Sequence, residues 1–73
     1  MLSDGELAVI TFIAQGLQTK EIAQRLGRAT RTIQVQRYNA MRKLNVHNVA
    51  EIVHWAVSNG HIKIETQASE RSF

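Results

Sequence analysis

One side of an expected helix over residues 30–44 combines basic and amide side chains with a valine and a tyrosine. Glutamine can bond the N6 and N7 positions of adenine, valine can pack on the methyl group of thymine, and arginine can contact guanine or a phosphate. A valine and a tyrosine are poorly explained as solvated residues of a basic face, although single exposed apolar residues are common. At about 100° per residue, this side holds Arg31, Gln34, Val35, Tyr38 and Arg42, and the opposite, inward side holds Ile33, Arg37, Ala40, Met41 and Leu44.

Positive charge is concentrated in the same part of the chain. Residues 20–43 hold seven basic residues and one acidic residue, which gives this segment a charge of +6, whereas the whole chain carries +3. Such a cluster attracts polyanions and speeds the encounter with them. Charge alone leaves a solvated surface as an equal alternative, and membrane binding is disfavoured because a wide apolar face with aromatic anchors is missing. The basic residues are Lys20, Arg25, Arg28, Arg31, Arg37, Arg42 and Lys43.

Two other patterns resemble metal or catalytic sites but have simpler explanations. His47, His54 and His61 recur every seven residues, yet on a continuous helix this spacing is about 10.5 Å, too far for one metal ion. Glu6 falls near the apolar side of the first helix, where pairing with an arginine or lysine of a neighbouring helix explains it. No glycine-rich phosphate loop or nucleophile elbow is visible. We therefore expect no enzymatic activity, no metal and no cofactor.

Four helices must position these side chains, and we expect them over residues 4–15, 20–26, 30–44 and 49–59. Ser3 with Glu6, and Asn48 with Glu51, have the spacing of capping boxes that begin the first and fourth helices. Thr19 is the expected N-cap of the second helix. These signals divide the chain cleanly into helical segments.

The connection between the second and third expected helices is very short. Gly27, Arg28 and Ala29 form a turn that starts with glycine, and two helices joined so tightly must cross steeply. Gly16 and Asn45 stand where a left-handed residue ends a helix. The sequence therefore predicts an all-α fold, a four-helix bundle containing a helix-turn-helix.

Length and composition are consistent with one small domain. The chain has 73 residues and no cysteine, so no disulfide can form, and this fits a reducing, cytoplasmic location. No apolar run approaches the roughly 18 residues that span a bilayer, and no signal peptide follows the start. We place the domain at residues 1–62 and expect a frayed tail at 63–73.

The combined pattern resembles a known family. It reads L-S-x-x-E-x-x-V-I-x-x-I-A-Q-G-L-x-T-K-E-I-A-x-x-L, then T-I-Q-V-Q and M-R-K-L-N-V-x-N. This resembles the LuxR-type (GerE-type) helix-turn-helix domain of bacterial transcription regulators, over about Leu2 to Ile62. The resemblance implies sequence-specific binding of double-stranded DNA by the second and third helices, and dimerisation through the fourth. Such domains are commonly the output modules of response regulators.

Matching positions carry the family's contacts onto this chain. The resemblance assigns base reading to Gln34, Val35 and Tyr38, with Arg31 as a possible fourth from the helix analysis, and phosphate contacts to Lys20 and Thr32. Further phosphate candidates from the charge pattern are Arg25, Arg28 and Arg42. A homodimer on DNA would use Trp55, Val57 and Val53 of the fourth helix, although Trp55 is equally explained as covering the edge of the core. RNA polymerase is a further candidate partner.

Four positions depart from the family's usual residues. Gly5 replaces a frequent arginine, and Ala29 replaces a capping serine, so that Thr30 is the candidate cap of the third helix. Gln34 replaces a frequent lysine. Lysine at this position would contact a phosphate or guanine, whereas glutamine is suited to bond adenine. Gln36 replaces a frequent histidine. Because of these departures, the family resemblance does not predict the DNA sequence that this chain binds.

Two other functions are consistent with parts of the sequence. Region four of a bacterial sigma factor has a related helix-turn-helix and a similar R-K-L ending, but it would normally finish near Leu44, before the fourth helix. A helical protein-interaction module without DNA binding is the alternative from another class.

Overall fold

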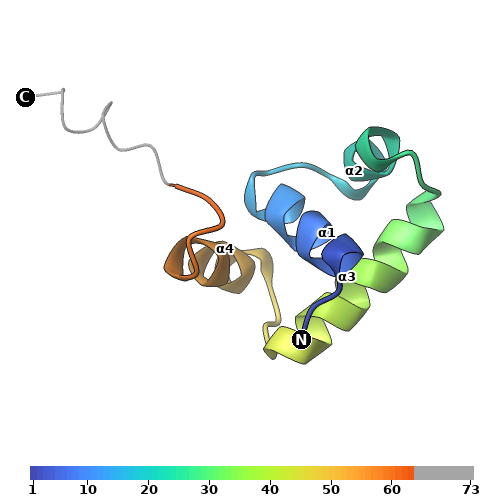
Figure 1. Cartoon of the computed structure of the whole chain (residues 1–73). Helices are drawn as coiled ribbons and strands as arrows, with labels where there is room; N and C mark the ends of the chain where they lie inside the picture. Colours follow the sequence, from blue (N-terminus) through green and yellow to red (C-terminus); the bar gives the residue numbers. More distant parts are fainter. Residues whose placement is uncertain (64–73) are drawn as a thin grey trace, which may run out of the picture.

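In the computed structural model, residues 1–63 are described, and they form four helices joined by short connections (Figure 1). Within this range there is no strand. The predicted all-α fold, with a helix-turn-helix formed by the second and third helices, is confirmed. The helices are α1 (Asp4–Ala14), α2 (Thr19–Leu26), α3 (Thr30–Leu44) and α4 (Val49–Ser58).

Helix α1 is the centre of the packing. It contacts each of the other three helices, and α2 also packs against α3. Figure 1 shows α1 between α4 on one side and the α2–α3 pair on the other. Burial of apolar surface in this arrangement drives the fold and leaves one side of α3 facing outward. The buried core consists of Val9, Ile10, Ile13, Ile22, Ala23, Ile33, Ala40, Ile52 and Ala56.

The first helix begins with the predicted capping box, and the fourth begins with the predicted Asn48 cap but with the Glu51 carboxylate bonded to His47 instead of Asn48. The Ser3 hydroxyl accepts from the backbone N–H of Glu6 at 3.1 Å, and the Glu6 carboxylate accepts from the Ser3 N–H at 2.9 Å. The Asn48 amide oxygen accepts from the Glu51 N–H at 2.9 Å. The Glu51 carboxylate accepts from the N–H of His47, one residue before the cap, at 2.6 Å. Both caps satisfy backbone donors that a helix start leaves unpaired.

Helix α2 begins one residue earlier than predicted, and its cap was wrongly assigned. Gln18, not Thr19, is the flanking residue, and Thr19 is already in the first helical turn. The Gln18 N–H donates to the Glu21 carboxylate at 2.9 Å, which fixes the start of the helix there. The ends of α1 and α4 were each predicted one residue too long, because Gln15 and Asn59 are the C-cap residues.

Helix α3 has the predicted bounds but no side-chain cap. Ala29 is the flanking residue, and Thr30 is the first helical residue rather than the expected replacement cap. At the other end, Asn45 adopts the predicted left-handed conformation with φ 56°, which asparagine tolerates better than other non-glycine residues. In the preceding turn, Gly27 has φ 64°, and the Arg28 N–H bonds the Ala23 carbonyl at 2.9 Å.

Two expectations concern the wider chain. Among the described helices, none is both long enough and apolar enough to cross a membrane. The tail expected at residues 63–73 lies, apart from Lys63, outside the described residues.

Candidate nucleic-acid interface

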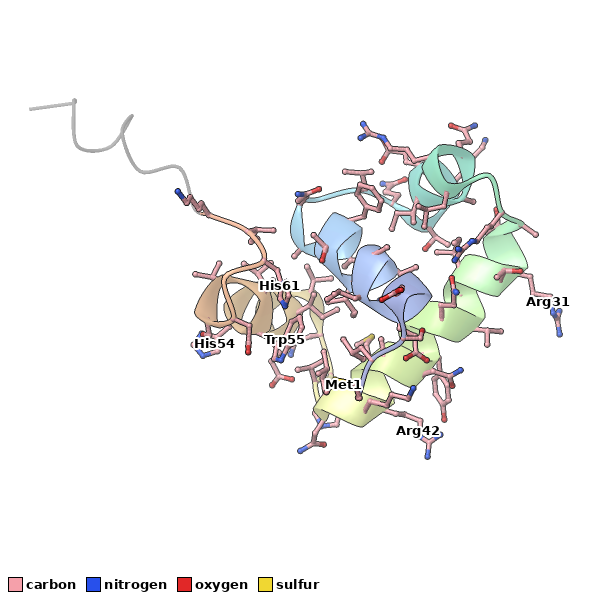
Figure 2. All side chains as sticks on the ribbon, viewed as in Figure 1. Met1, Arg31, Arg42, His54, Trp55 and His61 are labelled. Carbon is pink, nitrogen blue, oxygen red and sulfur yellow. The ribbon has the colours of Figure 1, made fainter. Side chains whose placement is uncertain are left out.

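The outward side of α3 presents the predicted base-reading residues together. Val35 is 51% exposed and Tyr38 is 64% exposed, and Gln34 beside them is also exposed. Ile33, on the opposite side of the same helix, is completely buried. Helix α3 is therefore held by its inner side and free along its outer side. Figure 2 shows Arg31 and Arg42 near opposite ends of α3, with both side chains directed away from the rest of the molecule.

Tyr38 and Arg42 contact each other on this outward side. The guanidinium carbon of Arg42 lies 5.8 Å from the centre of the Tyr38 ring, one helical turn away. This is within the range of a cation–π interaction. The contact limits the freedom of both side chains and leaves the Tyr38 hydroxyl available as a hydrogen-bonding group.

The five predicted phosphate-binding residues are all exposed but do not have equivalent surroundings. Lys20 and Arg25 lie on α2, Arg28 lies in the turn, and Thr32 and Arg42 lie on α3. The Arg25 guanidinium lies over the ring of Phe12, 5.9 Å from its centre, so Arg25 is held against α1. Arg28 instead donates from Nη1 to the Gln36 side-chain oxygen at 3.2 Å.

Lys43 does not belong to the outward side of α3, although it is part of the basic segment. Its Nζ donates to the Glu6 carboxylate of α1 at 2.7 Å. The hydrogen bonds from Lys43 and from the backbone of Ser3 hold the pKa of the Glu6 carboxyl below its usual range. Glu6 is buried, and the expected pairing with a basic residue of another helix is confirmed. This ion pair fixes the start of α1 to the end of α3.

The sequence did not predict that Gln36 of α3 and Arg28 lie over Gly5 of α1. A Cβ atom placed on Gly5 would lie 2.4 Å from Nε2 of Gln36 and 2.9 Å from Nη1 of Arg28. The Gln36 amide and the Arg28 guanidinium therefore lie directly over the backbone of Gly5. The available signal was that positions 5 and 36 both depart from the family's usual residues.

The predicted dimer residues lie on α4 and are half-buried. Trp55 packs against the core, and its ring stacks on His61 with centroids 5.0 Å apart and an interplanar angle of 21°. The intramolecular role considered for Trp55 is therefore present. Trp55 also lines a groove together with Val46, Ala50 and His54. Figure 2 shows Trp55 and His61 side by side at α4.

The three histidines do not form a cluster. Over residues 1–63, no three His, Asp or Glu side chains lie together in an arrangement that could hold a metal ion.

Comparison with known proteins agrees with this geometry. The family model for bacterial regulatory proteins of the luxR family matches residues 1–56. The response regulator UvrY of Escherichia coli strain K12 is 33% identical over 69 residues, which cover 94% of this chain and 32% of that protein. The transcriptional regulatory protein UhpA of Salmonella typhimurium is 42% identical over 53 residues, 73% of this chain and 27% of that protein. The Fimbriae Z protein of the same organism is 34% identical over 58 residues, 80% of this chain and 28% of that protein.

The chain spans about a third of the length of the curated relatives that it matches. No solved structure gives a significant match. The family match and the separate fourth helix leave no support for the sigma-factor alternative. By the family model and by these relatives, the chain belongs to the LuxR family of bacterial regulatory proteins.

Proposed function

We propose that this chain, a DNA-binding domain of the LuxR family of transcription regulators, reads double-stranded DNA by placing α3 in the major groove. The observation that carries the proposal is the exposure of Gln34, Val35 and Tyr38 on the side of α3 opposite the buried Ile33. An α-helix fits the major groove of B-DNA. An exposed valine and tyrosine on a basic surface are then explained by contact with bases.

Within this proposal, charged and uncharged residues have different tasks. Phosphate contacts from Lys20, Arg28 and Arg42 would set the position of the domain and its salt dependence, but they carry no sequence information. With these three contacts per subunit, the logarithm of the association constant would fall with the logarithm of salt at a slope of about −2.7. Base reading would rest on Gln34, Val35 and Tyr38, with Arg31 beside them.

Two substitutions test this division of tasks. Sequences bound by the chain are first selected from a random duplex pool, and affinities are then measured on a selected and on a random duplex. Gln34→Ala should weaken binding to the selected duplex by about 5- to 150-fold, since a good base contact contributes roughly 1–3 kcal/mol. It should leave the random duplex and the salt slope nearly unchanged. Lys20→Ala should weaken both complexes alike. Equal losses on both duplexes for Gln34→Ala would contradict the base-reading assignment.

We further propose that two copies bind an inverted repeat through α4. One module of this size buries limited surface on DNA, and dimers gain specificity by contacting two half-sites. Val53, Trp55 and Val57 are the candidate contacts, and of these Trp55 lines a groove that offers apolar surface, whereas Val53 lies on another side of α4. Sedimentation on a selected duplex should give two chains per duplex for the unaltered protein and fewer for Trp55→Ala. Unchanged stoichiometry with a retained fold would remove Trp55 from the interface.

A protein-interaction module without a nucleic-acid partner is the competing function. Binding to a random duplex at 50 and 200 mM salt separates the two possibilities. The proposal requires affinity that falls steeply between these concentrations. An interaction module would show no such salt-dependent affinity.

A further inference from the structure

Gly5, Arg28 and Gln36 come from three different parts of the chain and meet at one point. Gly5 lies in the first turn of α1, Arg28 in the turn before α3, and Gln36 in the second turn of α3. The Gln36 side-chain oxygen accepts from Nη1 of Arg28 at 3.2 Å. Both side chains occupy the space that a Cβ atom on Gly5 would need, at 2.4 Å from Gln36 and 2.9 Å from Arg28. Any larger residue at position 5 must displace them.

The contact lies on the side of α3 that is bonded to the start of α1. Gln36 and Lys43 are seven residues apart, so they share one side of the helix. Lys43 bonds Glu6 of α1 at 2.7 Å, and Gln36 lies over Gly5, the residue next to Glu6. This side of α3 therefore runs along the start of α1. Gln36 is half-buried there, whereas Arg28 is exposed.

Among residues 1–63, the bond to Gln36 engages a small part of the Arg28 guanidinium. An arginine side chain has five N–H donors in a rigid fork, and within this range one hydrogen bond, from Nη1, is present. A long side chain loses rotamer freedom when it binds, and ordering it beforehand reduces this loss. Arg28 is thus both ordered and still able to bind an anion such as a DNA phosphate.

We propose that Gln36 is a positioning residue that orders the Arg28 side chain for contact with a DNA phosphate, and that the absence of a side chain at Gly5 makes this possible. The inference rests on the proposed DNA-binding function. It gives the departures at positions 5 and 36 a common cause, because the Gln36 amide fills the space above Gly5. Helix α1 then contributes to DNA binding without touching DNA.

A double-mutant cycle between Gly5→Ala and Arg28→Ala tests the proposal with the complete chain and a random-sequence duplex at 0.1 M salt. Loss of one phosphate contact should weaken binding about eightfold in Arg28→Ala and make the salt slope shallower by about 0.9. Gly5→Ala should weaken binding about threefold, because Arg28 keeps its charge but loses its order. In the Arg28→Ala background, Gly5→Ala should cause no further change. Gln36→Ala should behave like Gly5→Ala, and Gln15→Ala, at the far end of α1, is the matched control.

A readout without DNA checks the contact itself. The NMR signals of the Gln36 side-chain amide should shift in both Gly5→Ala and Arg28→Ala, while thermal melting confirms that the variants fold. Alanine favours helix more than glycine does, so Gly5→Ala should not weaken α1 itself.

Three outcomes would overturn the inference alone: unchanged affinity in Gly5→Ala, tighter binding in Gly5→Ala, or the same threefold loss in the Arg28→Ala background. Absence of any salt-dependent binding by the unaltered chain would instead overturn the proposed function, and this inference with it.

Discussion

Alanine substitutions at Ile33 and Val35 should separate the packing of α3 from its recognition of DNA. The two residues are both β-branched and aliphatic, and they lie two positions apart on one helix. Ile33 is completely buried in the core, whereas Val35 is 51% exposed on the outward side. Ile33 should therefore contribute to stability, and Val35 to contact with DNA.

The expected losses follow from these exposures. Truncating a fully buried isoleucine to alanine costs about 2–5 kcal/mol. A domain of this length has a free energy of unfolding of about 4–11 kcal/mol, so Ile33→Ala removes a large fraction of it. At about 4–8 °C per kcal/mol for a domain of this size, a 3 kcal/mol loss would lower the Tm by about 12–24 °C.

Val35→Ala should leave the fold nearly unchanged. Surface substitutions usually alter the free energy of unfolding by less than about 0.5 kcal/mol, and alanine favours helix slightly more than valine. Its effect should appear in DNA binding. The two lost carbons are worth about 1.6 kcal/mol if fully buried against a thymine methyl, and about half of that if only the exposed half is gained. Affinity for a selected duplex should therefore fall by about 4- to 15-fold.

The assay combines thermal melting by circular dichroism with titration of a selected duplex, at a temperature where both variants are folded. Ile33→Val is the conservative control for the core and should cost about 0.5–1.5 kcal/mol. A Val35→Ala variant that melts as early as Ile33→Ala would contradict the exposed position of Val35. A Val35→Ala variant that binds the selected duplex like the unaltered chain would refute the assignment of Val35.

Three further predictions concern the helix ends and the ion pair. Ala29→Ser should add an N-cap to α3 and stabilise the chain by about 0.5–2 kcal/mol, measured by chemical denaturation; an unchanged midpoint would show that the helix start is satisfied in another way. Asn45→Ala should cost about 1 kcal/mol because the residue has φ 56°, whereas Asn45→Gly should be tolerated; equal losses would contradict a left-handed role. Because the folded chain lowers the pKa of Glu6, its ionised form contributes stability above the usual pKa of 4.5, and this contribution is lost as pH falls through the lower folded value. Lys43→Met should reduce the stability at neutral pH and make the loss of Tm on acidification smaller. If the Tm of the unaltered chain and that of Lys43→Met fell in parallel between pH 7 and 3, the ion pair would be contradicted.

Local signals predicted the helices because each was largely decided by neighbouring residues. The Ser3–Glu6 and Asn48–Glu51 spacings identified two helix starts, and Asn45 identified the end of α3. The α2 start was misjudged because two adjacent residues could each precede it. Threonine has the stronger intrinsic preference for the cap, but the Glu21 carboxylate bonds the N–H of Gln18.

The surface of α3 could be predicted for a similar reason. Helical periodicity alone separates Val35 and Tyr38 from the buried Ile33 and Ala40, and the structure places them accordingly. The separation required only the geometry of a single helix.

Helical periodicity could not predict contacts between residues that are distant in the sequence. The position of the Gln36 side chain depends on Gly5, 31 residues earlier, which has no side chain to occupy the same space. The packing of α1 against α3 brings these two residues together. From the sequence, Lys43 is one more charge of the basic segment. In the structure its ammonium group is paired with Glu6 of α1. Charge and residue type indicate what a side chain can bind, but the fold decides which side chains remain available.

Mapping NMR shift changes on addition of a selected duplex shows which side of the domain meets DNA. If the outward side of α3 reads DNA, the largest changes should occur in the backbone and side-chain signals of Gln34, Val35 and Tyr38, with smaller changes at Lys20 and Arg28. Changes that gather on α4 around Trp55 and leave the outward side of α3 unaffected would contradict it.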